Sequence, residues 1–325
     1  EAQLGTVLLS MPISSLIGLP ISGWLVSKFD SRLPMIVAMM FLSLALAFIG
    51  FADTPFLLVA ALSLYSFSSR ILYISMNTQS ITIQKKYTKK IVGSFHGLWS
   101  TGGLLGVVLS TIMVKYNVPL QLHLATIAIF IAIISLLIFS YTLKNDKSTF
   151  GNKLIFGKPD PFIFYLGLLV FFAAICEGGM FDWSGVYFKK VVEIEPGLVA
   201  LGYVSFMGAM ATGRFISDKM NNKFGRVLIL RMSGLLIFSG LILSVLFPVP
   251  VIATVGFLLV GLGVAAIIPI SYSIAGRSKL YSPGVSLAMV STISFFGFLI
   301  GPPMIGFIAD LLSLKASFAI VAVAG

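Results

Sequence analysis

Two ionisable side chains lie inside long apolar stretches of the sequence, where such groups usually have a function. Arg70 lies at the midpoint of the apolar stretch 55–83, and Glu177 lies within the apolar stretch 161–188. An ionisable group at the middle of a bilayer costs at least about 2–3 kcal/mol, so it normally faces a cavity or a partner. A guanidinium there can bind a carboxylate with two hydrogen bonds, and a carboxylate there can carry a proton.

Arg70 belongs to a polar stripe on one face of a predicted helix over 55–83. Residues three or four apart share a helix face, and this one carries Ser66, Arg70, Tyr73, Asn77 and Gln84. A water-filled pathway explains such a stripe better than lipid does, and the alternative is a structural arginine that bonds carbonyl groups or an acid. Tyr272, in the apolar stretch 250–275, adds a hydroxyl that suits a polyol. The predicted solute-binding residues are Arg70, Tyr73, Asn77, Glu177 and Tyr272.

Glu177 has three interpretations that the sequence leaves open. It can carry a proton, it can pair with Arg70 or contact the solute, or it can be structural. Asp182 is five residues further on, about 140° around a helix, so the two acids do not share a face. A catalytic pair of carboxylates is therefore not indicated, and we expect no enzyme activity. Glu177 is the proton-coupling candidate.

The composition is typical of a membrane protein. The chain has 325 residues, of which 58% are hydrophobic and 10% charged, and its mean hydropathy is +1.05. A soluble domain carries about 25% charged residues, which excludes an ordinary soluble enzyme. The net charge of +11 is not accompanied by a soluble module with stacking aromatics, so no nucleic-acid partner is expected. One cysteine and no cluster with metal-ligand spacing predict neither a metal nor a cofactor.

The apolar stretches are long enough to cross a bilayer as helices. A membrane helix needs about 20 apolar residues, whereas a barrel strand needs about 10 with strict alternation. We therefore predict an all-α polytopic membrane protein with eleven spans, the last one short. The spans are 4–26, 33–52, 55–83, 91–114, 119–143, 161–188, 198–220, 227–247, 250–275, 284–309 and a clipped one from 314.

Positive charges are distributed unequally between alternate loops. One set of loops carries 15 lysines and arginines and the other set carries 4. Loops on the cytoplasmic side carry the excess of positive charge, so the first set is predicted to be cytoplasmic. That set includes the segment 144–160, and it follows that residue 1 lies on the outer side.

Three pairs of landmarks recur at an offset of 190–195 residues, which indicates two similar halves. Gly23–Lys28 is similar to Gly213–Lys219, and Asn77 corresponds to Pro269. Glycines at 102–106 correspond to glycines at 297–301, and both groups resemble small-residue helix contacts.

The offset also predicts which helices the chain contains. Span 161–188 lacks a partner in the first half, and the partner of span 119–143 would run past residue 325. We therefore expect a fragment of a twelve-helix protein that lacks the first helix and part of the last. The predicted organisation is an N-terminal half with helices 2–6 over 1–143, a cytoplasmic linker over 144–160, and a C-terminal half with helices 7–12 over 161–325.

The stretch 213–226 resembles the signature motif of the major facilitator superfamily. It reads Gly-Arg-Phe-Ile-Ser-Asp-Lys, five further residues, then Gly-Arg. In that family the motif follows the second helix of a half on the cytoplasmic side, and its Asp belongs to a charge and helix-terminus network that holds one access state. In the first half, Ser27 stands where the Asp is expected. The resemblance assigns a gating role to Gly213, Arg214, Asp218, Gly225 and Arg226.

A second group of segments is similar to the fucose-permease-like branch of that family. In this branch, an acid four residues before the asparagine that is equivalent to Asn77 is linked to proton coupling. In this sequence Tyr73 stands at the position of that acid. The resemblance implies the major facilitator fold, with two six-helix repeats that rock about a site in the middle of the membrane. The segments are 76–79, 94–103, 177–178 with 182–184, and 301–303.

These observations predict a secondary active transporter of the bacterial inner membrane. It would move a small polar solute, a sugar or a sugar-like compound, by proton-coupled alternating access. A central arginine also suits an anionic sugar acid. The alternatives are an antiporter that exports drugs or metabolites and a membrane sensor or scaffold without transport. The expected partners are the solute, protons or another coupling ion, and the lipid bilayer, and the expected state is a monomer.

Overall fold

The computed structural model describes residues 2–146 and 159–325, and this part of the chain is all-helical. Two short 3-10 helices, η1 (Phe139–Tyr141) and η2 (Pro196–Leu198), adjoin the α-helices. The α-helices are α1 (Ala2–Lys28), α2 (Arg32–Phe51), α3 (Pro55–Gln84), α4 (Val92–Lys115), α5 (Leu120–Ile138), α6 (Pro161–Lys190), α7 (Leu201–Phe224), α8 (Arg226–Leu246), α9 (Pro250–Ala275), α10 (Pro283–Leu311) and α11 (Leu314–Ala324).

These helices confirm the predicted spans to within a few residues at most ends. Ten of them are long and apolar enough to cross a membrane, and α11 is a shorter apolar helix. Many of their large hydrophobic side chains are exposed on α2, α4 and α5, as expected for surfaces that face lipid. The chain is a multi-pass membrane protein.

Local sequence explains where several helices begin and end. The hydroxyl of Thr54 accepts a hydrogen bond from the Leu57 N–H at 3.3 Å, and Pro55 takes the first helical position of α3. Ser313 caps α11 in the same way through the Ala316 N–H. Gly225 separates α7 from α8 with a φ of +80°, a conformation that residues with a side chain rarely adopt.

The described residues divide into two compact units, and each is described by itself. Unit 1 comprises 1–86, 103–163 and 275–292, and unit 2 comprises 87–102, 164–274 and 293–325. The division runs within α4 and α10. The predicted boundary between two halves at 144–160 stays a prediction, and most of that segment, 147–158, lies outside the described residues.

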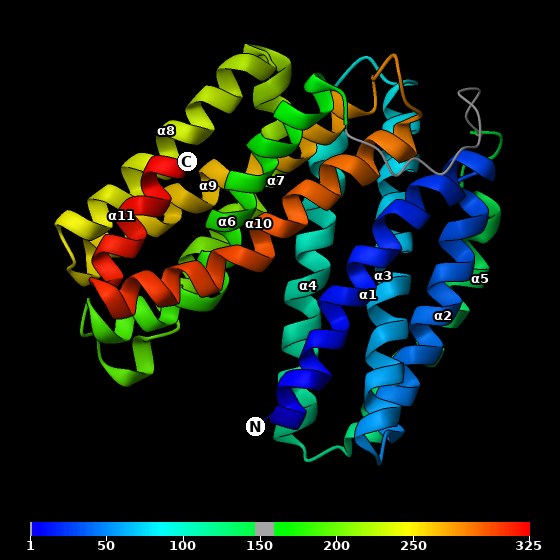
Figure 1. Cartoon of the computed structure of the whole chain (residues 1–325), viewed down its shortest axis with the longest axis horizontal. Helices are drawn as coiled ribbons and strands as arrows, with labels where there is room; N and C mark the ends of the chain where they lie inside the picture. Colours follow the sequence, from blue (N-terminus) through cyan, green and yellow to red (C-terminus); the bar gives the residue numbers. More distant parts are fainter. Residues whose placement is uncertain (1, 147–158) are drawn as a thin grey trace. The chain divides into compact units, whose positions relative to one another are not determined.

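In unit 1, α3 packs against α1 and α2, and α2 packs against α5 (Figure 1). The α2–α3 seam has a small apolar core that includes Met35, Ala38 and Ile71. α1 approaches α3 closely at Gly18, where an added Cβ would lie 3.2 Å from the Cβ of Arg70. This close approach places the middle of α3, which carries the predicted polar stripe, directly against α1.

Unit 1 also contains a close contact between α1 and the first turns of α10. An added Cβ at Gly23 would lie 2.7 Å from the Cβ of Ala288 and 3.2 Å from the carbonyl oxygen of Gly284. At the end of the same seam, the hydroxyls of Ser27 and Ser282 share a hydrogen bond of 2.5 Å. The two helices therefore meet through small residues, which let their backbones come close together.

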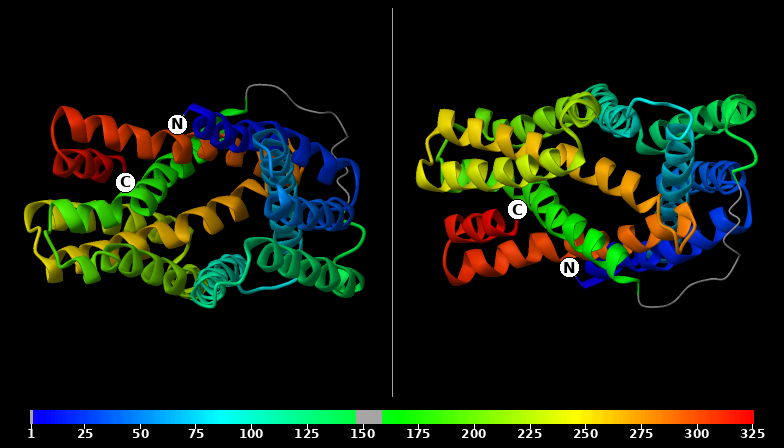
Figure 2. Two further views of the ribbon diagram at one scale, coloured as in Figure 1. Left: turned by 90° about the horizontal axis from the view of Figure 1, so that it is seen from below. Right: turned by 90° about the horizontal axis from the view of Figure 1, so that it is seen from above.

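Unit 2 has a large core that is rich in aromatic side chains. The ring of Tyr187 packs on that of Phe318 at a tilt of 34°, with centroids 4.5 Å apart, and the Tyr187 hydroxyl donates to the Ser244 carbonyl at 2.9 Å. Both views of Figure 2 show α11 alongside the C-terminal part of α10, where Ser317 donates to the Ile305 carbonyl. This core fixes α6, α8, α10 and α11 within the unit.

The two groups of glycines predicted to mediate helix contacts behave differently. An added Cβ at Gly301 would lie 3.0 Å from the Cα of Ile175, so α10 does pack closely on α6. An added Cβ at Gly102, Gly103 or Gly106 would meet no described atom within 4 Å. The helix contact expected at 102–106 is therefore not made by the described residues and stays a prediction.

The segment that follows η1 is attached to unit 1 by side-chain hydrogen bonds. Gln79 of α3 donates to the Leu143 carbonyl at 3.2 Å and accepts from its N–H at 3.3 Å. The carboxylate of Asp146 accepts from the Ser31 N–H at 2.8 Å and from the Ser31 hydroxyl. The first residues of the predicted linker are thus held beside α3 and the α1–α2 turn.

Candidate functional site

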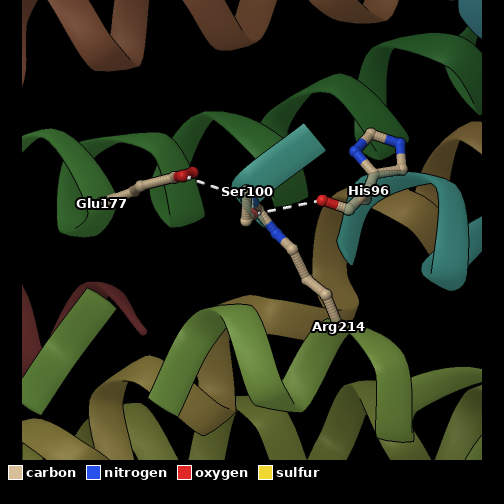
Figure 3. Close-up of polar contacts among 4 residues, drawn as sticks. All are labelled: His96, Ser100, Glu177 and Arg214. Carbon is tan, nitrogen blue, oxygen red and sulfur yellow. Dashed lines mark hydrogen bonds and ion pairs between the residues drawn. The ribbon is translucent and has the colours of Figure 1, made fainter. Parts of the chain in front are cut away.

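A buried ion pair joins three helices of unit 2. The Nη2 of Arg214 on α7 donates to the Oε1 of Glu177 on α6 at 3.1 Å (Figure 3). The Nη1 of the same guanidinium donates to the hydroxyl of Ser100 on α4, and that hydroxyl donates to the His96 carbonyl at 3.1 Å. The ion pair therefore ties α4 and α6 to α7 through a single side chain.

Both partners of the ion pair are almost fully buried. Arg214 is 6% exposed and Glu177 is 8% exposed. A buried charge needs a partner, because an unpaired one costs several kcal/mol. The sequence left open a pairing of Glu177 with Arg70, and the structure gives Glu177 a different counter-ion, Arg214, which sequence reasoning had placed in the gate.

One N–H donor of the Arg214 guanidinium takes no part in these contacts. Its Nε is buried and has no hydrogen-bond partner among the described residues. Nε and Nη2 form the side edge of a guanidinium, the edge on which a carboxylate can bind with two oxygens. Glu177 uses only Nη2, so it occupies half of that edge.

His96 lies next to this pair and contacts a predicted solute-binding residue. Its ring meets the ring of Tyr272 on α9 edge to face, with centroids 6.0 Å apart. His96 is 6% exposed, Tyr272 is 2% exposed, and the Nε2 of His96 has no hydrogen-bond partner among the described residues. The polar centre of unit 2 thus contains Ser100, His96, Glu177, Arg214 and Tyr272.

The other predicted solute-binding residues lie together on α3 in unit 1. The guanidinium of Arg70 lies over the ring of Tyr73, 5.8 Å from its centroid. The amide of Asn77 donates to the Tyr73 carbonyl one turn back, at 2.8 Å. Asn77 is buried and the other two are partly buried, as expected for one face of a packed helix. Their role in solute binding stays a prediction.

Asp218 anchors the beginning of α4 to α7. Its Oδ1 accepts from the Gly93 N–H at 2.8 Å, and its Oδ2 accepts from the Ser94 N–H at 2.6 Å and from the Ser94 hydroxyl at 2.7 Å. The first N–H groups of a helix have no partner within the helix and attract a negative charge. A carboxylate of α7 therefore acts as the N-cap of α4.

The predicted gate motif is more helical than a loop. We predicted that the apolar span ends at residue 220, but α7 continues through Lys219–Phe224, and only Gly225 separates it from Arg226, the first residue of α8. Polar residues continue a helix readily where it leaves the bilayer. Gly213, the first residue of the motif, packs closely on α9, where an added Cβ would lie 2.8 Å from the Cβ of Ala265.

Gly93 and Gly97 allow α4 to lie directly on α7. An added Cβ at Gly93 would lie 2.8 Å from the Arg214 carbonyl oxygen, and one at Gly97 would lie 2.8 Å from the ring of Phe215. The spacing of four residues puts both glycines on one face of α4. The same face carries the anchor for Asp218.

We expect Gly93→Ala to separate α4 from α7 and to destabilise the protein. The added methyl would collide with a backbone oxygen that cannot move on its own, at a cost of roughly 1–3 kcal/mol. The measurement is the apparent melting temperature of the purified protein in detergent. Gly102→Ala is the matched control on the same helix, and it should be neutral or slightly stabilising. Equal melting temperatures for the two variants would contradict this contact.

Sequence reasoning singled out the segment 94–103 but gave the residues of α4 no role in the site. Ser100 and His96 are four residues apart and share a face, a spacing that is visible in the sequence. Gly93 and Ser94 stand at the start of a predicted helix, where a capping carboxylate is expected. The missing information was which other helix that face meets.

The ten long apolar helices of the described residues define a polytopic membrane protein. The chain belongs to the Major Facilitator Superfamily, whose family profile it matches over residues 1–279. It is 31% identical to an uncharacterised MFS-type transporter of Yersinia pestis, over 99% of this chain and 84% of that protein. The family and this relative are transporters, not enzymes.

Solved structures confirm the major facilitator fold. The structure of the E. coli fucose:proton symporter FucP superposes with a TM-score of 0.81 at 16% identity, over 99% of this chain and 88% of that one. The human organic anion transporter MFSD10 superposes with a TM-score of 0.77 at 15% identity, over 100% of this chain and 83% of that one. The resemblance inferred from the signature motif is therefore confirmed at the level of family and fold.

Proposed function

We propose that this protein is a secondary active transporter that moves a small polar solute across the bacterial inner membrane by alternating access. The solute is a sugar or a sugar-like compound, and its movement is coupled to protons through Glu177. The observation that carries the proposal is the buried Glu177–Arg214 ion pair within a chain of the Major Facilitator Superfamily. The likeness to a fucose:proton symporter supports the same class of solute and the same coupling ion.

The ion pair suits a coupling site because its two states differ in charge. With Glu177 ionised, the carboxylate and the guanidinium neutralise each other across α6 and α7. With Glu177 protonated, the attraction is lost and Arg214 keeps its positive charge. A group whose protonation changes the contact between two helices can bias a conformational equilibrium.

Arg70, Tyr73 and Asn77 on α3, with Tyr272 on α9, are the proposed solute contacts. On α3, Arg70, Tyr73 and Asn77 offer a cation, a phenolic hydroxyl and an amide, which suit a solute with several hydroxyl groups. On α9, Tyr272 offers a further phenolic hydroxyl. The gate is proposed to lie at Asp218 and its contact with α4, near the junction at Gly225 and Arg226. The loops with the positive charges, including 144–160, are proposed to be cytoplasmic, residue 1 to be outside, and the protein to work as a monomer.

The test is solute uptake into proteoliposomes that carry the purified protein. Radiolabelled neutral hexoses, deoxyhexoses and sugar acids are offered with and without an inward proton gradient. We expect accumulation of at least one solute that requires the gradient. In Glu177→Gln, accumulation should fall at least about tenfold while exchange of solute for solute continues, since the binding site remains.

The matched control is Asp182→Asn, an acid-to-amide change on the same helix at an exposed position. This variant should accumulate solute like the unaltered protein. Accumulation that ignores the proton gradient would overturn the coupling to protons. Release of solute from the vesicles that is driven by the inward proton gradient, without uptake, would identify an antiporter that exports its solute.

A further inference from the structure

We propose that the Nε–Nη2 edge of Arg214 is a binding site for the carboxylate of a small anionic solute. The solute displaces Glu177 from Nη2, and Glu177 takes up a proton when it is displaced. This inference rests on the proposed function, because it uses Glu177 as the coupling acid, and it adds the chemical class of the solute.

The Arg214 guanidinium has a buried donor that Glu177 does not use. Nε of Arg214 is buried and has no hydrogen-bond partner among the described residues, and Glu177 contacts only Nη2. A buried donor without a partner costs about 1–3 kcal/mol. A carboxylate that binds the whole edge satisfies both donors, and charge-assisted pairs of this geometry are the strongest that arginine forms. Nη1 stays with Ser100, so the guanidinium keeps its orientation.

Glu177 and a solute carboxylate cannot both use this edge. A solute that binds with two oxygens needs Nη2, which Glu177 now holds at 3.1 Å. Once displaced, Glu177 would be an anion with 8% exposure and no counter-ion, a state that costs several kcal/mol. Protonation removes that cost, so binding of the carboxylate and protonation of Glu177 favour each other.

Among the described residues of unit 2, the other groups next to Glu177 do not provide a replacement for Arg214. On α6 the preceding side chain is the buried thiol of Cys176, and α10 meets the next residue, Gly178, with Phe298 and Pro302. Asp218, one turn beyond Arg214 on α7, is an acid and is bound to α4. The titratable side chains that the described residues bring to this centre are Glu177, Arg214, His96, Tyr272 and Cys176.

The charges in this exchange balance. Before binding, the Glu177 carboxylate and the Arg214 guanidinium sum to zero. After binding, Glu177 has gained one proton from the medium and is neutral, and the solute carboxylate neutralises Arg214. One proton and one negative charge enter the site together, so the loaded site carries no net charge. The inference therefore predicts electroneutral symport of one proton with one carboxylate.

The first test measures binding and proton uptake in the purified protein. The probes are glucuronate, lactate and acetate, with glucose as the neutral counterpart of glucuronate. We expect carboxylate binding to take up about one proton per site, and the affinity to fall about tenfold per pH unit wherever Glu177 is ionised before binding. In Glu177→Gln we expect binding without proton uptake and without this pH dependence. Asp182→Asn should behave like the unaltered protein.

One further variant, and a second measurement on Glu177→Gln, examine the arginine edge. Arg214→Lys keeps the charge but loses the fork, so carboxylate binding should weaken at least about tenfold. Glu177→Gln leaves Arg214 without its counter-ion, so acetate should raise its melting temperature more than that of the unaltered protein. Neutral glucose should have no such effect. If no carboxylate stabilises Glu177→Gln, or if the unaltered protein binds carboxylates without taking up protons, the inference is wrong.

The second test measures transport and separates this inference from the proposed function. Uptake of a carboxylate should follow a pH gradient and should not respond to a potassium diffusion potential. Gradient-driven uptake of a neutral sugar that responds to both forces would preserve the proposed function and overturn the anionic solute. Absence of gradient-driven uptake of every solute would overturn the proposed function itself.

Discussion

Replacing Asp218 with alanine is expected to release the beginning of α4 from α7. The change removes three hydrogen bonds to a carboxylate, those from the Gly93 N–H, the Ser94 N–H and the Ser94 hydroxyl. Water replaces part of them, so the net cost is roughly 2–4 kcal/mol. A change of this size alters the ratio of the attached to the detached state by at least about thirtyfold, and transport should slow because one access state loses its anchor.

A disulfide cross-link can measure this release. The Lys90 N–H donates to the Asn222 side chain at 2.8 Å, so Lys90→Cys and Asn222→Cys together report whether α4 stays on α7. The native Cys176 is 1% exposed and gives little background. We expect efficient cross-linking in the parent protein and a strong loss in Asp218→Ala. Equal cross-linking in both would show that Asp218 does not hold the seam.

The Glu177–Arg214 pair is expected to show strong coupling in a double-mutant cycle. Arg214→Gln alone leaves Glu177 buried without a counter-ion, which should cost about 3–5 kcal/mol. The apparent melting temperature in detergent should fall by roughly 5–15 °C. The double variant Glu177→Gln, Arg214→Gln leaves two neutral amides that can bond each other, so it should recover most of the loss.

One outcome of the double-mutant cycle would contradict the Glu177–Arg214 interaction. If the losses of the two single variants simply add in the double variant, the residues do not interact in the native state. Asp182→Asn provides the control for removing an acid from α6. Because it is exposed, it should change the melting temperature by less than about 2 °C.

The helices of this protein were predictable because apolar length is what the bilayer requires. Stretches such as 33–52 and 250–275 are apolar throughout and bounded by polar or proline residues, and they became α2 and α9. The end of α7 was not predictable by the same rule. Lys219–Phe224 is too polar for a bilayer, yet a helix can continue outside it until a residue such as Gly225 ends it.

The sequence singled out individual residues of the candidate site but not the contacts that these residues make. Glu177 and Arg70 stood out because charge is rare in apolar spans, and Arg214 and Asp218 because they belong to a motif. Arg214 and Asp218 are four residues apart on α7, so one face of the helix makes two different contacts. One residue pairs with α6 and the other caps α4. Sequence spacing shows the face but not the helices that pack against it.

Ser27 and Asp218 occupy corresponding positions, 191 residues apart, and they hold the start of a neighbouring helix in different ways. At α4, two backbone N–H groups depend on the carboxylate of another helix. At α10, the Val285 N–H donates to the hydroxyl of Ser282 in its own chain segment, and the Ser27 hydroxyl shares a hydrogen bond with that same hydroxyl.

Because of this difference, amide hydrogen exchange can detect opening of the α4–α7 contact but not of the α1–α10 contact. The N–H groups of Gly93 and Ser94 lose their acceptor each time α4 leaves α7, so their exchange with deuterium counts those openings. The Val285 N–H keeps its acceptor when α1 leaves α10, so opening of that seam exposes no corresponding amide. Deuterium uptake at the start of α4 therefore reports opening of the α4–α7 contact alone, without any added probe.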